Sequence, residues 1–356
     1  VLPVAQNRAG KSPAGDESMG YLRSALLQDA SHVGVSSADG VSMTKLSHRG
    51  RFGNQLFQYA FLRLYGLRNH LTAKLPEWQG EAMFGLSDAR AALNEYPDIF
   101  LDSFEDDDLV LWQQDAPPAN VNFDGPFQAV PESWRAHRHF LRLLFTPHPE
   151  RNAELAACSA RREDRTLVVI HVRRGDYETL TAQDAGSPFR TTPLEWYDAA
   201  LRELWPTLRN PVLHVATDGG APVKQFFAAW PQLEAVPAGI PPDLADFFLL
   251  RDADVALICN SSFSRMASLL AKDGQRVFLP DFEAKRFVAY DPWDDRAFWA
   301  RVHSEKRPAA QLENLRHASL RLRQALGAAL HRPSGSLQVT ASPAPLPCRC
   351  CGGEAL

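Results

Sequence analysis

Two adjacent arginines at the end of a predicted strand are the residues of this chain best suited to bind an anion. The run His171-Val172-Arg173-Arg174-Gly175-Asp176-Tyr177 directly follows Leu167-Val168-Val169-Ile170, an apolar and β-branched segment typical of a buried strand. Open α/β sheets bind their ligands at the carboxyl ends of the strands. Because guanidinium groups match phosphate oxygens in a bidentate way, the run predicts a site for a pyrophosphate.

The charged and polar residues of this run are expected to play different parts. His171 is expected to hydrogen-bond a nucleotide or to orient the arginines. Arg173 and Arg174 point in opposite directions if the strand continues, so we expect one of them to face the ligand. Asp176 is expected to hold an arginine through a salt bridge, and the alternative for the whole run is an Arg–Asp cluster without a ligand.

A glycine-bearing loop precedes a predicted helix near the start of the chain. The run Gly50-Arg51-Phe52-Gly53-Asn54-Gln55 follows a predicted strand over 41–46, and a helix is expected from Asn54 through Leu67. Such a loop presents backbone N–H groups and the positive end of a helix to an anion. Short glycine patterns are weakly specific, so an ordinary tight turn is the alternative.

Two further predicted strand ends carry polar residues. Asp218, in Ala216-Thr217-Asp218-Gly219-Gly220, can accept N–H donors from a guanine edge or bind a ribose. The run Asn260-Ser261-Ser262-Phe263-Ser264-Arg265 offers hydroxyls and free amides at a helix start, which suit a diphosphate. Capping of the following helix is the alternative for both segments.

Two acidic runs and one pair of cysteines have spacings found in metal sites, but we expect no metal site in the body of the chain. Mg²⁺ needs carboxylates that converge on phosphates, and the arginines already supply positive charge. We therefore interpret the two acidic runs as solvated faces: Asp106-Asp107-Asp108 and Asp252-Ala253-Asp254. Cys348 and Cys351 have the spacing of half a zinc site, but a tetrahedral site needs about four ligands. A disordered cysteine-bearing tail is the alternative.

An alternation of strands and helices positions the polar runs, which indicates a parallel sheet with crossover helices. The expected strands are 166–172, 212–217, 255–259 and 276–279. The expected helices between and after them are 194–205, 220–230, 242–251 and 263–272. Helices are also expected at 133–145 and 150–162, whereas 76–131 is interpreted as irregular.

Composition limits the class of protein. A length of 356 residues suggests two domains, and a net charge of -4 gives no reason to expect a nucleic acid partner. We find no apolar run of about 18 residues that could span a membrane and no secretory signal. Five unevenly placed cysteines favour a reducing compartment, so we expect a cytoplasmic protein, with peripheral association at the inner membrane as a further expectation.

In order and composition, the polar segments resemble the α-1,2-fucosyltransferase family. The resemblance covers about residues 41 to 280 and rests on Gly50 through Ala60, His171 through Tyr177 and Asn260 through Ser264. The wider superfamily, which includes α-1,6- and protein O-fucosyltransferases, shares the HxRRxD element and a segment similar to Ala216-Thr217-Asp218. The resemblance implies an α/β fold of the GT-B type, in which two Rossmann-like domains with parallel sheets face a cleft.

The resemblance also implies an activity and site roles. It implies an inverting enzyme that moves fucose from GDP-fucose to a glycan hydroxyl, with a galactoside 2-OH favoured, in surface polysaccharide synthesis and without an obligatory divalent metal. Arg173 would hold the β-phosphate, with His171 and Asp218 on the guanosine. The Gly50 loop and the Ser262 segment would close on the diphosphate. Apart from the resemblance, the candidate catalytic residues are Arg173, Asp176 and Glu178, with Asp184 as the alternative base because no motif fixes this role.

Two departures from the family pattern keep alternatives open. Arg265-Met266 stands where an aromatic pair is common, and Gly219 where a second aspartate is frequent. These changes leave the linkage and the acceptor undecided. The alternatives are another NDP-sugar transferase that uses the same arginine clamp, or a catalytically silent module that binds a nucleotide sugar or a glycan.

The expected domain organisation follows from these assignments. The segments are a flexible arm over 1–40, an N-terminal acceptor-side domain over 41–162, a C-terminal GDP-sugar-binding domain over 163–304, an amphipathic helix over 305–331, and a linker with the start of a CxxC segment over 332–356. The cysteine-bearing tail resembles the start of a zinc-binding segment of some sugar-processing methyltransferases. A C-terminal methyltransferase or other domain is therefore expected in a longer protein.

Overall fold

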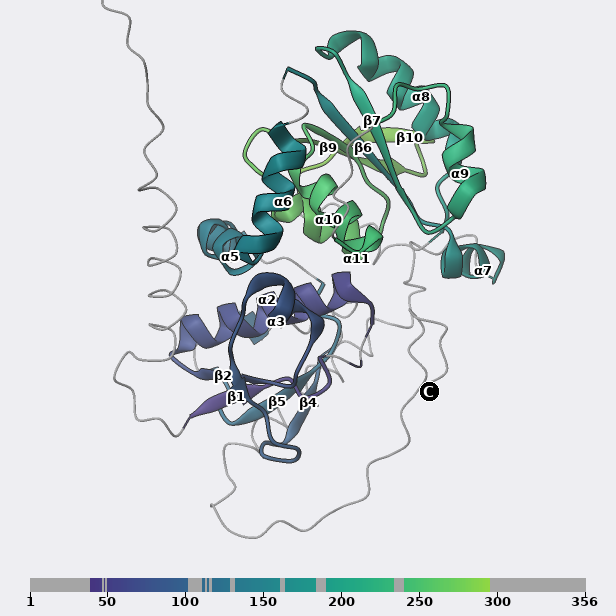
Figure 1. Cartoon of the computed structure of the whole chain (residues 1–356). Helices are drawn as coiled ribbons and strands as arrows, with labels where there is room; N and C mark the ends of the chain where they lie inside the picture. The colour runs from purple at the N-terminus through teal and green to yellow at the C-terminus, as the bar shows by residue number, and fades with distance from the viewer. Residues whose placement is uncertain are drawn as a thin grey trace, which may run out of the picture.

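Two five-stranded sheets, each dominated by parallel strands, organise the computed structural model (Figure 1). It describes residues 39–294, apart from 47, 49, 102–110, 113, 115–116, 129–131, 161–163, 184–189 and 234–239. Several predicted features fall outside the described residues: the arm up to residue 38, Asp106 through Asp108, Asp184, the helix over 305–331 and the tail with Cys348 and Cys351.

The first sheet is parallel throughout and has the strand order β3-β2-β1-β5-β4. Its strands are β1 (Gly40–Ser42), β2 (Thr72–Leu75), β3 (Ala89–Arg90), β4 (Asp98–Phe100) and β5 (Val121–Asp124). The prediction of an irregular segment over 76–131 is wrong in part, because it contains three of these strands and helix α3 (Gln79–Phe84). Elements of two to six residues are too short for hydrophobic periodicity to reveal.

We call the part of the molecule around the first sheet the first half and the part around the second sheet the second half. The long helix α2 (Phe52–Asn69) lies between the first sheet and the second half (Figure 1). It begins two residues before the predicted start at Asn54, and every residue from Phe52 to Gly66 except Asn54 is buried. A helix with neighbours on two sides buries more than one stripe of its surface. His70 ends α2 in the left-handed conformation, with its N–H bonded to the carbonyl of Gly66.

The second sheet has the order β10-β9-β8-β6-β7. Its strands are β6 (Leu167–Val172), β7 (Val212–Thr217), β8 (Val255–Leu257), β9 (Arg276–Asp281) and β10 (Arg286–Ala289). The four predicted strands are confirmed as parallel neighbours. The prediction missed β10, a four-residue strand that returns antiparallel beside β9.

Helices cover both faces of the second sheet, as alternating side chains of β6 show. Val168 and Ile170 pack in one apolar cluster with Tyr197 and Leu201 of helix α8 (Leu194–Leu204). Leu167 and Val169 belong to the other cluster, which contains the apolar residues of α10 (Pro242–Asp252) and α11 (Ser262–Leu269). The other helices in the described part of the chain are η2 (Glu132–His137), α5 (Arg138–Leu144), α6 (Pro149–Ala160), α7 (Gly175–Gln183), η3 (Trp205–Thr207) and α9 (Gly220–Phe226).

One apolar core joins the two halves. The cluster under α10 and α11 continues without a break into α2 and the first sheet. The ring of Phe247 meets Phe52 edge-on at 5.4 Å between centroids and Phe263 at 5.4 Å, and Phe248 meets Phe84 at 6.3 Å. The α/β class with two parallel-dominated sheets is thus confirmed, whereas the domain boundaries and the cleft between the sheets stay predictions.

The acidic run Asp252-Ala253-Asp254 is not a purely solvated face. Asp254 accepts the backbone N–H of Leu167 at 2.8 Å and pairs with Lys272 at 2.7 Å, so it holds the start of β6. Asp252 pairs with Arg251 at 2.7 Å. Among the described residues, no three His, Cys, Asp or Glu side chains come together as a metal site would need.

Helix length and hydropathy bear on the membrane expectation. Within the described part of the chain, no helix is both long and apolar enough to cross a bilayer.

We predict that Phe247→Ala lowers the free energy of unfolding by about 3–5 kcal/mol, because it removes a buried ring from the junction of the two halves. Equilibrium denaturation in urea measures this change. Phe226→Ala is the control, since 43% of Phe226 is exposed, and it should cost less than half as much. Equal losses in the two variants would contradict a shared core at Phe247.

Candidate anion-binding site

The register between β6 and β7 brings the second and third polar segments together. These parallel strands place Val172 opposite Thr217, so the next residues, Arg173 and Asp218, leave the sheet side by side. The Thr217 hydroxyl donates to the carbonyl of Val172 at 2.7 Å and accepts from the N–H of Gly219 at 2.9 Å. Thr217 therefore closes the turn before the helix at Gly220–Phe226, whose N-cap residue is Gly219 without a side-chain capping bond, so neither Thr217 nor Asp218 caps it. The carboxylate of Asp218 is directed toward Arg173.

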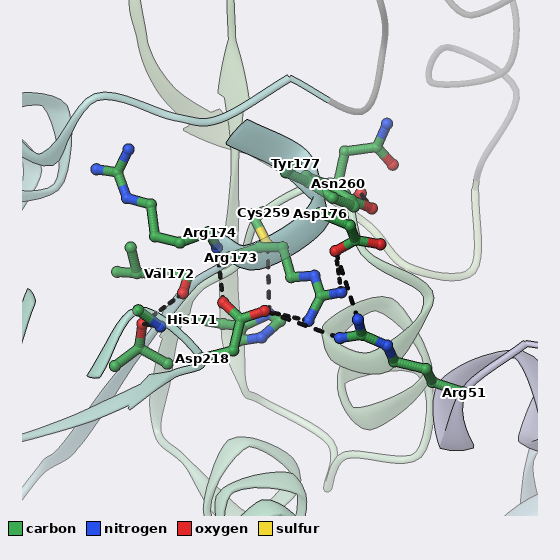
Figure 2. A network of polar contacts seen from close by, with 12 residues as sticks. Arg51, His171, Val172, Arg173, Arg174, Asp176, Tyr177, Asp218, Cys259 and Asn260 are labelled. Carbon is green, nitrogen blue, oxygen red and sulfur yellow. Dashed lines mark hydrogen bonds and ion pairs between the residues drawn. The ribbon is translucent and has the colours of Figure 1, made fainter. Parts of the chain in front are cut away.

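The Arg173 guanidinium lies between two carboxylates (Figure 2). Its Nη1 donates to Asp218 and its Nη2 to Asp176, which lies in the first turn of α7. The guanidinium also lies over the ring of Tyr177 at 5.3 Å, and the Tyr177 hydroxyl donates to the carbonyl of Asn260 at 2.7 Å. Only 13% of the Arg173 side chain is exposed, so its position is fixed by these partners.

Arg51 joins the same network from the glycine loop of the first half. Its Nη2 lies 3.8 Å from Asp176 and its Nη1 lies 3.9 Å from Asp218 (Figure 2). The Arg51 side chain is 66% exposed, in contrast to Arg173. Two guanidiniums and two carboxylates therefore form a charge-balanced group at the surface, to which the first and second halves of the molecule each contribute.

Gly53 allows the glycine loop to touch the Ser262 segment. A Cβ atom at Gly53 would collide with the backbone of Phe263 and would lie 2.7 Å from the carbonyl carbon of Ser262. Glycine is therefore required there by close approach of two backbones. The contact brings the N-terminal ends of α2 and α11 together, so two positive helix ends lie near the paired arginines.

Arg174 contributes its backbone and points its side chain elsewhere. Its N–H donates to Asp218 at 2.7 Å, while its side chain extends away from the Arg173 cluster (Figure 2). A Cβ at Gly219 would lie 2.8 Å from Cγ of Arg174, which places the stem of this side chain against Gly219. The two adjacent arginines thus diverge, although β6 ends at Val172 and the strand does not continue through them as the alternation argument required.

His171 is buried and uncharged. It is 6% exposed, its Nδ1 lies 3.3 Å from Sγ of Cys259, and its ring packs against Phe263 at 5.2 Å. Burial, assisted by the charge of Arg173, lowers the pKa of His171 to about 3. Burial raises the pKa of the Cys259 thiol to about 12. His171 therefore supplies a neutral ring behind the arginines.

The remaining predicted residues lie around this network with different exposures. Ser261 occupies the N-cap position of α11 without a capping bond from its side chain, and Ser264 donates to the carbonyl of Cys259 at 3.2 Å. Glu178 is exposed in the first turn of α7. Gly50 has a φ of +78°, and its carbonyl accepts from the Gln55 amide at 3.2 Å.

The sequence prediction missed Gln128, which contacts the glycine loop from the segment after β5. Its Nε2 donates to Oδ1 of Asn54 at 2.9 Å, and it is only 5% exposed. It lies in a region interpreted as irregular, where no strand end indicated that a polar side chain would reach the site. A glutamine between apolar residues in Asp124-Gly125-Pro126-Phe127-Gln128 was the available signal.

Comparison with known proteins gives neither a matching family model nor a matching curated protein. The chain is similar to the solved structure of NodZ α-1,6-fucosyltransferase soaked with GDP-fucose, at 18% identity and a TM-score of 0.48, over 71% of this chain and 99% of that chain. The chain is also similar to the solved structure of fucosyltransferase NodZ from Bradyrhizobium, at 19% identity and a TM-score of 0.49, with the same coverage of both chains. Likeness at this level assigns no function, so the chemistry has to come from the site residues themselves.

We predict that His171→Gln reduces the acid sensitivity of folding. The pKa of His171 is about 3 in the folded chain, against about 6.5 when unfolded, so only the unfolded chain binds this proton between those values. Wild-type stability should therefore fall as pH drops below about 6.5, by about 2 kcal/mol at pH 5 from this group. The variant should lose that much less between pH 7 and pH 5, measured by urea denaturation.

The control for this prediction is His48→Gln, because His48 is exposed. It should keep the wild-type dependence of unfolding free energy on pH. A His171→Gln protein whose stability falls as steeply as that of the wild type would show that the buried imidazole is not the source.

Proposed function

We propose that this chain is an inverting glycosyltransferase that transfers fucose from GDP-fucose to a glycan hydroxyl, with a galactoside 2-OH as the favoured acceptor. The observation that supports it is the convergence of Arg51 and Arg173 with the first turns of α2 and α11. This arrangement suits a diphosphate. The order of the three motif segments along the chain resembles that of fucosyltransferases and favours a GDP sugar as the ligand.

The arginines would act on the leaving group. When the bond between the fucose anomeric carbon and the phosphate oxygen breaks, its electron pair stays on the β-phosphate of GDP. A preoriented guanidinium stabilises this charge as it develops. Each charged hydrogen bond contributes about 1.5–3 kcal/mol. Arg173 is preoriented by Asp176 and Asp218, while the more exposed Arg51 can turn toward the ligand.

The acceptor would enter from the opposite face of the sugar. Its oxygen forms the new bond to the anomeric carbon, and its proton passes to a base. We assign this role to Glu178, which is exposed in the first turn of α7, two residues after Asp176. Asp176 is engaged by Arg173, so its part is to hold the guanidinium.

The guanosine would lie near His171 and Asp218. His171 offers a neutral ring and little exposed surface. Asp218 already accepts from Arg173 and from the N–H of Arg174, but a carboxylate has about four acceptor positions, so the guanine edge can share it.

Calorimetry with GDP, UDP and ADP tests the donor. We expect GDP to bind at least about tenfold more tightly than the other two, a difference of about 1.4 kcal/mol. Turnover of GDP-fucose with a panel of galactosides then tests transfer, and EDTA should leave it intact because arginines replace the metal. Equal affinities would reject the donor, whereas GDP binding with neither transfer nor hydrolysis would favour a silent binding module.

Arg173→Lys tests the clamp while keeping the charge. We expect GDP affinity to fall by about 10- to 100-fold, because lysine cannot form the bidentate fork. Arg174→Lys should lose much less, since its side chain points away. Arg202→Lys, at an exposed site on α8, is the control for any general effect of an arginine-to-lysine exchange on the stability of the protein. Equal affinity of the Arg173 and Arg202 variants for GDP would show that Arg173 does not hold the diphosphate.

A further inference from the structure

A chain of two polar contacts, one buried and one half-buried, crosses from the second half of the molecule to the glycine loop. Arg265 of α11 is 2% exposed and its Nη2 donates to the backbone carbonyl of Gln128 at 3.1 Å. The side chain of Gln128 in turn donates to Oδ1 of Asn54 at 2.9 Å. Asn54 lies in the first turn of α2, next to the loop that carries Arg51.

The burial of Arg265 indicates a role other than stabilising the core. Removing a guanidinium from water is costly, and apolar residues of similar volume often serve stability as well or better. Arg265 lies over the ring of Phe57 at 5.5 Å, a place that an apolar side chain could fill. What the arginine adds is a directed hydrogen bond to the Gln128 carbonyl across the junction of the two halves.

The contact from Gln128 decides which way the Asn54 amide faces. Because its oxygen accepts from Gln128, its NH₂ group is turned the other way, and it lies against Gly50. A Cβ at Gly50 would collide with Nδ2 of Asn54 and would lie 2.8 Å from its Cγ. An N–H donor is thereby presented at the glycine loop, and donors rather than acceptors favour an anionic ligand.

We propose that Arg265 and Gln128 are positioning residues for diphosphate binding: together they hold the Asn54 amide with its NH₂ group toward the loop of Gly50 and Arg51. The inference rests on the proposed function, since it presumes that a diphosphate binds at this loop. It also gives a role to Arg265, which departs from the aromatic pair common in the family that the chain resembles.

The test compares the affinities for GDP and for guanosine, which lacks the phosphates. Gln128→Met removes the bond to Asn54, and we expect it to weaken GDP binding about three- to tenfold while guanosine affinity stays within about twofold. Arg265→Met should show the same selective loss, and Arg265→Lys, which keeps a donor, should recover part of it. Displacement titrations on the full chain, with melting temperatures of each variant, give these values.

Arg68→Met is the matched control. Arg68 also donates to a backbone carbonyl, that of Trp112 at 2.7 Å, and lies over its ring at 5.3 Å, but it is at the far end of α2. It should leave both affinities unchanged. Equal losses of GDP and guanosine affinity in Gln128→Met, or no loss, would overturn the positioning role. A wild-type protein that binds guanosine as tightly as GDP would instead overturn the proposed function, and this inference with it.

Discussion

The geometry of the site depends on the Arg173 guanidinium held between Asp176 and Asp218. Asp218 also accepts the N–H of Arg174 at 2.7 Å, so one carboxylate ties the ends of β6 and β7 to each other. Asp176 links the first turn of α7 to the Arg173 guanidinium, and Arg51 links the glycine loop to Asp176. Because two guanidiniums face two carboxylates, the folded chain can hold two guanidiniums close together at a strand end before any ligand binds.

That network can form only if the two halves keep a fixed relation, and the apolar core provides it. Phe247 packs against both Phe52, the first residue of α2, and Phe263, the second residue of α11. Gly53 then lets these two helix ends touch. An ion pair farther out joins Arg142 to Asp273 at 3.0 Å. Close packing transmits displacements, so the position of Arg51 depends on rings that no ligand would contact.

The second sheet could be predicted well from the sequence. Its strands are short apolar runs, such as Leu167 through Ile170, and segments with the periodicity of helices separate them along the chain. The sequence also predicted correctly that Arg173 follows the end of a strand, since charge at a strand end is visible in the local pattern alone. The first sheet was largely missed, because strands such as Ala89–Arg90 are too short to show a period. Gln128 was missed for another reason: its contact with Asn54 joins residues 74 positions apart, and no local pattern encodes such a contact.

Arginine has a property that makes this charge-balanced site suitable for an anion. A guanidinium carries five N–H donors, and the bonds from Nη1 and Nη2 of Arg173 to Asp218 and Asp176 use two of them. The same side chain can therefore keep both carboxylates and still donate to phosphate oxygens. A lysine has three donors on one nitrogen and could not divide them along two edges. The carboxylates thus fix the direction of the guanidinium, and the unused donors set where an anion can bind.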